Sequence, residues 1–169
     1  MVVKEYQSPF GRLYLASIGN ELCICSWNGL RSFRDVIGRQ ESESDYQREW
    51  GVIEHARQEL EEYFDGSREQ FDIPLRILGT EFQKLVWHAL MSIPYGDTET
   101  YSELAESIGR PRSVMAVAKA CSRNPLAIFI PCHRVTKADG RPAERSGNCA
   151  VKERLLHLER AGVAEMEAV

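Results

Sequence analysis

The residues with the clearest chemical potential in this chain are Cys132, His133 and Arg134, which follow an apolar run that ends in a proline (residues 128–131). A proline interrupts ladder pairing and fixes the backbone just before the thiol. We therefore expect Cys132 to end a buried segment, where a cleft could reach it. A thiol reacts as its thiolate, so a nearby cation or general base would make it a nucleophile. The alternative is a cysteine that only packs, as most free cysteines do.

A basic segment surrounds this candidate nucleophile. The 169-residue chain has a net charge of -4, yet residues 109–145 hold 8 Lys and Arg against 2 Asp and Glu. Residues 1–78 hold 9 against 14 and are acidic. A local positive excess is typical of a protein that binds a phosphate-bearing partner. An ordinary solvated surface would give the same count, so other motifs must separate the two interpretations.

Composition sets the class of protein. With 43% hydrophobic and 27% charged residues the chain is typical of a globular protein of one or two domains. We see no signal peptide and no apolar stretch long enough for a membrane span. Five cysteines without framework spacing favour a reducing compartment: the cytoplasm, or the nucleus in a eukaryote. Cys23 and Cys25 share a strand face, but no ligand-spaced His or Cys follows, so packing is favoured over a metal pair.

The first half of the chain predicts a small sheet with one helix. Alternating residues indicate strands over 2–6, 12–18 and 21–27, with a turn at 8–11. Apolar positions at helical spacing indicate a helix over 52–64, preceded by a loop or frayed helix over 39–49. Residues 71–75 are expected to be a short strand or an extended linker. We expect residues 1–78 to be an α+β domain without chemistry of its own.

The second half, residues 79–169, predicts a mostly helical domain. Thr80 is expected to cap a first helix, and Asp97 or Thr98 a second one over 100–107. A glycine turn leads to a third helix over 114–122, and this pair has the pattern of a helix-turn-helix. A final helix over 150–161 places Glu159 near its end. A carboxylate is unfavourable there for the helix dipole, so we expect it to have a specific partner.

The third helix carries small side chains, among them Ser113 and Ala116. Small residues allow close packing against another helix, and they equally allow a helix to enter a narrow groove. Basic residues flank the helix and are positioned to meet phosphates: Arg110, Arg112, Lys119 and Arg123.

At this point the chain resembles the O6-alkylguanine-DNA alkyltransferases, also called methylated-DNA–protein-cysteine methyltransferases. The resemblance runs nearly end to end and culminates in Ile-Pro-Cys-His-Arg-Val at 130–135, downstream of Asn-Pro at 124–125. Other matching segments are 8–11, 79–83, 86–87, 93–96, 100–101 and 104–105. The resemblance implies an α/β (α+β) fold: a ribonuclease-H-like first domain, then a winged-helix-like helix-turn-helix domain.

The implied function is direct DNA repair. The family binds duplex DNA through the minor groove, flips the damaged guanine and moves the alkyl group from O6 onto a cysteine, which is not regenerated. O4 of thymine is left open as a second substrate atom. The implied partner is double-stranded DNA containing O6-alkylguanine, with no membrane, no cofactor and a monomeric protein. Some members carry a structural zinc in the first domain, but the matching positions include Ile18 and no histidine, so we expect no metal.

By resemblance, Cys132 is the acceptor, His133 its base through a bridging water, and Glu159 orients the imidazole. Asn124 supports the active-site turn. The remaining implied residues lie against the substrate or the DNA: Tyr101, Arg112, Ser113, Met115, Ala116, Arg123, Arg134, Val135, Arg145 and Ser146.

The chain departs from the family pattern at three positions. Met115 stands where the family has an arginine that fills the place of the flipped base, and Arg145 replaces a pocket tyrosine. Ala127 replaces a pocket proline. Two alternatives stay open: an alkyltransferase-like protein that binds the lesion without efficient transfer, and a cysteine hydrolase that uses Cys132 and His133. The cysteine argues against the first, and the basic helix-turn-helix against the second.

Overall fold

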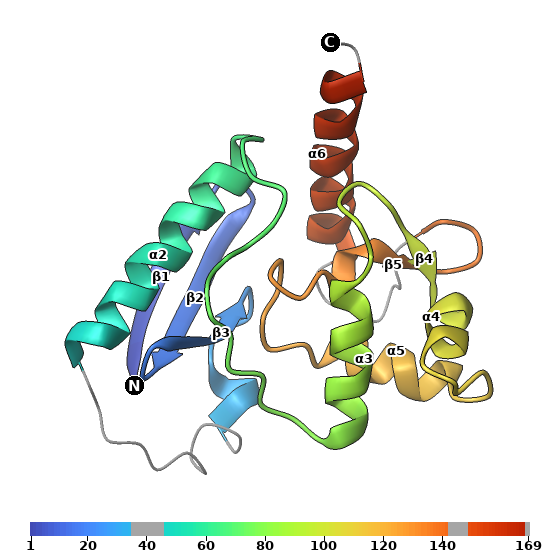
Figure 1. Cartoon of the computed structure of the whole chain (residues 1–169), viewed down its shortest axis with the longest axis horizontal. Helices are drawn as coiled ribbons and strands as arrows, with labels where there is room; N and C mark the ends of the chain where they lie inside the picture. Colours follow the sequence, from blue (N-terminus) through green and yellow to red (C-terminus); the bar gives the residue numbers. More distant parts are fainter. Residues whose placement is uncertain (35–45, 142–148, 168–169) are drawn as a thin grey trace. The chain divides into compact units, whose positions relative to one another are not determined.

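The structure is a computed structural model that describes residues 1–34, 46–141 and 149–167. It contains two compact units: Met1–Gly79 with Pro125–Ala127, and Thr80–Asn124 with Ile128–Val169. In the described residues, the first unit is a small sheet with one long helix and the second is mostly helical (Figure 1). The α+β class expected from the sequence is thereby confirmed. No helix among the described residues has the length and apolar character to cross a membrane.

The sheet of the first unit is an antiparallel meander of β1 (Val2–Ser8), β2 (Gly11–Ile18) and β3 (Glu21–Ser26). The β1–β2 turn is closed by the Ser8 hydroxyl, which donates to the Gly11 carbonyl at 2.5 Å. Gly11 has a φ of 131°, which a side chain would oppose. Helix α2 (Tyr46–Phe64) packs on all three strands. The core between them includes Leu13, Leu15, Ile53, Leu60 and Tyr63.

Helix α2 begins six residues before the helix that the apolar spacing predicts. Its first turns are held by Glu49, which is fully buried. The Glu49 carbonyl accepts from the Ser17 hydroxyl at 2.9 Å, and its carboxylate accepts from the Gly19 amide at 3.3 Å. Because these contacts are polar and reach the distant strand β2, the local hydrophobic pattern does not reveal them.

Two segments from elsewhere in the chain pair alongside strand β3. Leu22 pairs with Leu75, and Cys25 pairs with Leu126, both in parallel. The stretch 71–75 is thus an extended segment that pairs with β3 at one residue, Leu75. Residues 125–127 belong to the first unit, although they lie late in the sequence. Burial raises the pKa of the Cys23 thiol to about 11, and Cys25 is also fully buried. Both cysteines pack in the core.

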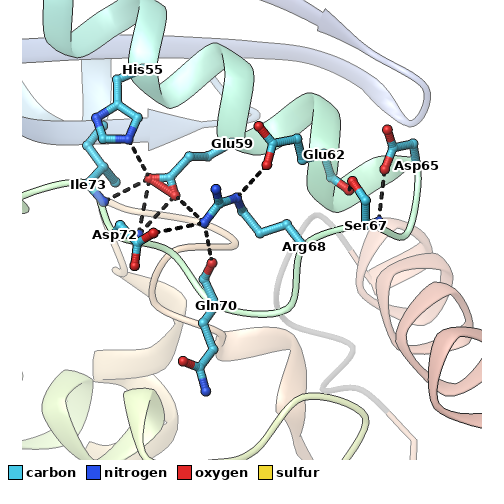
Figure 2. Close-up of polar contacts among 9 residues, drawn as sticks. All are labelled: His55, Glu59, Glu62, Asp65, Ser67, Arg68, Gln70, Asp72 and Ile73. Atoms are coloured by element: carbon cyan, nitrogen blue, oxygen red, sulfur yellow. Dashed lines mark hydrogen bonds and ion pairs between the residues drawn. The ribbon is translucent and has the colours of Figure 1, made fainter. Parts of the chain in front are cut away.

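A buried carboxylate fastens the chain that follows α2 back onto the helix (Figure 2). Glu59 accepts from the amides of Asp72, at 2.9 Å, and Ile73, at 2.8 Å. Arg68 and His55 each approach the same carboxylate at 3.2 Å. A fully buried carboxylate is costly unless donors surround it, and this network supplies them. No local pattern in the sequence distinguishes Glu59 from the exposed glutamates of the same helix.

The second unit contains α3 (Glu81–Met91), α4 (Tyr101–Ser107), α5 (Val114–Ser122) and α6 (Cys149–Glu167). A one-turn helix η2 (Cys132–Arg134) leads into β5 (Val135–Thr136), which pairs in parallel with β4 (Glu99–Thr100). Thr80 caps α3 as expected. The cap of α4 is Thr100, not Asp97 or Thr98, because Thr100 completes a capping box with Glu103.

Helices α4 and α5 form the expected hairpin. Helix α4 ends in a Schellman motif, in which the Arg110 amide donates to the Ala105 carbonyl and the Gly109 amide to that of Glu106. Gly109 has a φ of 74°, as the motif requires. The Trp87 indole on α3 donates to the Ala120 carbonyl on α5 at 2.9 Å, which fixes α5 against α3.

Candidate active site

Cys132 begins η2, directly after Pro131, and its side chain is partly exposed. The apolar residues before it are buried, but they form no strand, since Ile128 has a φ of 75°. Two donors converge on the Ile130 carbonyl: the Asn124 side-chain amide at 2.7 Å and the Cys132 amide at 2.8 Å. Asn124 therefore holds the turn that presents the thiol.

The imidazole of His133 lies against the carboxylate of Glu159. The Nε2 atom of His133 is 2.5 Å from Oε2 of Glu159, and both side chains are buried. The Nδ1 atom of His133 is also buried and has no hydrogen-bond partner in the part of the chain that the structure describes. A proton on Nε2, donated to the carboxylate, leaves Nδ1 with a lone pair that can accept a proton.

Arg134 holds the same carboxylate from the other side. Its Nε atom donates to Oε1 of Glu159 at 2.8 Å, and its Nη2 atom to Oε2 at 3.2 Å. The Nη1 atom donates to the Ile93 carbonyl at 2.7 Å, and the Gly96 amide donates to Oε1 at 3.0 Å. The family resemblance implies a DNA contact for Arg134. In the structure Arg134 is buried, with 7% of its surface exposed, because a buried carboxylate needs a cation to offset its desolvation.

The pKa values of His133 and Glu159 are both lowered, for different physical reasons. Burial lowers the pKa of His133, and the hydrogen bond and charge of Glu159 only partly oppose this. Burial alone would raise the pKa of Glu159, but His133 and Arg134 outweigh it, and the pKa of the carboxyl lies well below its usual range. At neutral pH the site holds a neutral imidazole beside an ionised carboxylate.

The position of Glu159 in its helix differs from the expectation. Helix α6 continues to Glu167, so Glu159 does not lie in the last turn and the dipole argument does not apply to it. Its partners follow instead from the packing of α6 against η2.

A second cysteine lies in the same unit. Cys121 on α5 is 2% exposed, and burial, together with the nearby Cys132 thiol, raises the pKa of Cys121 to about 12. It is therefore a poor nucleophile. Cys23, Cys25 and Cys121 are buried, whereas Cys132 is partly exposed.

Val135 and Tyr101, both implied at the substrate by the resemblance, lie in or next to the β4–β5 ladder. In this ladder Glu99 pairs with Val135, and Thr100 with Thr136. This short ladder ties the start of α4, where Tyr101 is 8% exposed, to the backbone that follows Cys132. Arg145 and Ser146 fall outside the described residues.

Helix α5 has a buried and an exposed face. Val117, Ala120 and Cys121 face the core, whereas Met115 is 79% exposed. Five of the residues expected near DNA are exposed, on the same helix or at its ends: Arg110, Arg112, Ala116, Lys119 and Arg123. Ser113 is half-buried. The exposed face is therefore basic with an apolar tip at Met115.

Comparisons with known proteins match both halves of the chain. Residues 1–77 match the family model "6-O-methylguanine DNA methyltransferase, ribonuclease-like domain", and residues 81–161 match "6-O-methylguanine DNA methyltransferase, DNA binding domain". A relative from Methanosarcina barkeri, a methylated-DNA–protein-cysteine methyltransferase, is 44% identical over 90% of this chain and 93% of its own. The crystal structure of Mycobacterium tuberculosis OGT in complex with DNA is 36% identical, with a TM-score of 0.79, over 95% of this chain and 93% of that one.

Proposed function

The chain belongs to the 6-O-methylguanine DNA methyltransferase family, and we propose that it repairs duplex DNA by moving an alkyl group from O6 of guanine to Cys132. The observation that carries the proposal is a partly exposed thiol next to a buried His133–Glu159 pair whose second ring nitrogen is available. This arrangement supplies a nucleophile and a base.

In the proposed reaction, the Cys132 thiol gives its proton to Nδ1 of His133 through a bridging water, as the family resemblance implies. Glu159 keeps the imidazole in the tautomer that leaves Nδ1 free. The thiolate then attacks the alkyl carbon, so that an S–C bond forms and the C–O6 bond breaks. The electron pair goes to guanine O6, and guanine takes up the proton that the thiol gave up. Because the thioether is stable, each molecule acts once.

The guanine must leave the duplex stack before its O6 substituent can reach a thiol. We assign this step to the exposed face of α5, with Met115 in the gap left by the base and Arg112 and Arg123 near phosphates. Ser113 and Ala116 allow close approach to the groove. Tyr101, Val135, Arg145 and Ser146 contact the flipped base in this proposal. Arg134 is assigned to the support of Glu159. The protein acts as a monomer inside the cell.

Intact-protein mass spectrometry after mixing with duplex DNA containing O6-methylguanine tests the proposal. We expect one methyl group per protein, located on Cys132 by peptide mapping. Cys132→Ser should abolish the gain, and the matched variant Cys121→Ser should retain it. Methylation on Cys121 or Cys149, or binding to the lesion without any mass gain, would refute transfer to Cys132.

A further inference from the structure

A tight turn over residues 94–97 supplies one of the donors that hold Glu159. The Asp97 amide donates to the Pro94 carbonyl at 3.1 Å, and Gly96 has a φ of 82°, as the third residue of a type II turn does. The backbone amide of Gly96 donates to Oε1 of Glu159 at 3.0 Å. Because this donor belongs to the main chain, its position depends on how the turn packs against α6.

The turn and α6 approach each other closely at two glycines. A Cβ atom added at Gly96, in the turn, would lie 2.6 Å from Cγ2 of Val163. A Cβ atom added at Gly162, in the helix, would lie 2.8 Å from the hydroxyl oxygen of Tyr95. Side-chain carbons do not approach other atoms this closely, so the packing requires that both positions lack a side chain. Gly162 and Val163 follow Glu159 by three and four residues, so all three share one face of α6.

The same turn contacts the arginine that holds the carboxylate. The guanidinium carbon of Arg134 lies 5.8 Å from the centre of the Tyr95 ring, within the range of a cation–π contact. The Nη1 atom of Arg134 donates to the carbonyl of Ile93, just before the turn, at 2.7 Å. Tyr95 therefore contacts both Arg134 and Gly162. A shift of its ring would reach the carboxylate through the arginine and through the backbone amide of the turn.

Gly162 is an unfavourable residue for its place in the chain. Helix α6 runs from Cys149 to Glu167, and a glycine inside a helix is less stable than an alanine. Gly51, inside α2, is a useful comparison, since a Cβ atom added there would meet no atom of the described residues within 4 Å. At Gly162 the neighbouring tyrosine gives the missing side chain a physical reason.

We propose that Gly162 and Tyr95 are positioning residues for the transfer reaction. Because Gly162 has no side chain, the Tyr95 ring lies close against α6, and the turn brings its backbone amide onto Glu159, which holds His133. The close contacts at the two glycines and the hydrogen bond from Gly96 carry this inference. It rests on the proposed function for the role of His133 as the base.

The competing explanation is that the contact serves only the packing of α6. In that case an added methyl group at Gly162 is accommodated by a rotation of the Tyr95 side chain, and the turn stays where it is. The carboxylate then keeps all its donors. The two explanations differ in whether the His133–Glu159 hydrogen bond changes when the helix gains a side chain at this position.

Gly162→Ala, in the full-length protein without DNA, separates them. The readout is the proton resonance of the His133 Nε2–H group, which is buried and donates to Glu159. Its loss in His133→Gln assigns it. We expect this resonance to shift or broaden in Gly162→Ala. In a Tyr95→Phe background the same alanine should cause little further change, because the nearest atom is gone and the next two ring atoms lie 3.4 and 3.5 Å from the added carbon.

Single-turnover transfer from the free base O6-benzylguanine gives a second readout. Displacing a positioned group by ~1 Å costs up to ~10²-fold in rate, so Gly162→Ala should react roughly 10-fold more slowly than the wild type. Its affinity for duplex DNA should not change. Adding the alanine to Tyr95→Phe should leave the rate of Tyr95→Phe nearly unaltered. The matched control is Gly51→Ala, which should keep the wild-type resonance and the wild-type rate.

An unchanged His133 resonance in Gly162→Ala would overturn the inference, whether or not the melting temperature falls. Equal effects of the alanine with Tyr95 and with Phe at position 95 would also overturn it, because the hydroxyl contact would then be irrelevant. If Gly162→Ala does not fold, Tyr95→Leu removes the ring from the other side, and the same shift is expected. Failure of the wild type to gain a methyl group from lesion DNA would refute the proposed function, whereas the resonance decides what positions Glu159.

Discussion

The Oε2 atom of Glu159, on helix α6, lies 2.5 Å from the Nε2 atom of His133, on η2, although the two residues are 26 positions apart in the sequence. The same carboxylate also holds Arg134 and the Gly96 amide, so its position is set from three directions. Because His133, Arg134 and Glu159 are all buried, the orientation of the imidazole is set within the protein, without bound DNA. The base that we propose is therefore in place before the substrate arrives.

Glu159→Gln should slow alkyl transfer more than it weakens DNA binding. The neutral amide no longer favours a proton on Nε2, and it leaves Arg134 without its counter-ion. Loss of a positioned base typically costs ~10- to 10⁴-fold in rate. Single-turnover transfer and DNA-binding titrations measure the two effects. Glu153→Gln, an exposed position on the same helix, is the matched control. Equal transfer rates for the wild type and Glu159→Gln would rule out this role.

Acidification should destabilise the fold through His133. In the unfolded chain a histidine has a pKa of about 6.5, whereas burial lowers the pKa of His133 in the folded protein. Below about pH 6.5 the unfolded state therefore binds more protons, and the free energy of unfolding falls. Glu159 acts in the same direction at lower pH, because its pKa is also lowered in the folded state.

Urea unfolding as a function of pH measures this effect. His133→Gln should show a smaller loss of stability between neutral pH and pH ~5 than the wild type, by up to roughly 1.4 kcal/mol per pH unit. His157→Gln removes an exposed histidine from α6 and should keep the full slope. A slope for His133→Gln as steep as that of the wild type would contradict the assignment.

Glu59→Ala should destabilise the first unit strongly. The substitution removes the acceptor of the Asp72 and Ile73 amides and one partner of Arg68. Loss of such a buried network typically costs roughly 2–4 kcal/mol. The control is Glu61→Ala on the same helix, where the ion pair with Arg57 is exposed and screened by water, so its loss should change stability little. Denaturant unfolding compares the two, and similar losses for both variants would show that the Glu59 network has no special weight.

The sequence predicts elements well where the signal is local. The three strands, the helix-turn-helix and the Thr80 cap follow from alternation, helical spacing and capping chemistry, and each lies within a few residues of its predicted place. The start of α2 is missed because Glu49 is held by contacts with β2 that no local pattern shows. Likewise, residues 125–127 pair with β3, about 100 positions earlier in the chain.

The candidate site follows the same division. The proline before Cys132 and the adjacent histidine mark a candidate nucleophile, but the orientation of Arg134 depends on a carboxylate in a different helix. A surface arginine and a buried one look alike in a sequence, so the sequence alone does not separate a DNA contact from support of Glu159. Glu59 is a similar case, because a charged residue on a helix is usually exposed and only packing shows that this one is not.

Met115 gives the sharpest test of how α5 acts on DNA. At 79% exposure its side chain contributes little to the core, so an arginine at this position should leave the fold intact. A methionine can fill the gap left by a flipped base only by apolar contact, and the unpaired cytosine keeps unsatisfied hydrogen-bonding groups. An arginine also supplies donors to that cytosine, and flipping costs a few kcal/mol that such contacts offset.

Met115→Arg should therefore speed transfer from duplex DNA while leaving the reaction with the free base O6-benzylguanine nearly unchanged. The free base needs no flipping, so the two substrates separate helix insertion from the chemistry of Cys132. Lys84→Arg, on α3, changes a side chain outside the proposed interface and should alter neither rate. A parallel loss with both substrates, together with a lowered melting temperature, would show that Met115 supports the fold. Unchanged rates with both substrates would show that α5 does not insert at this residue.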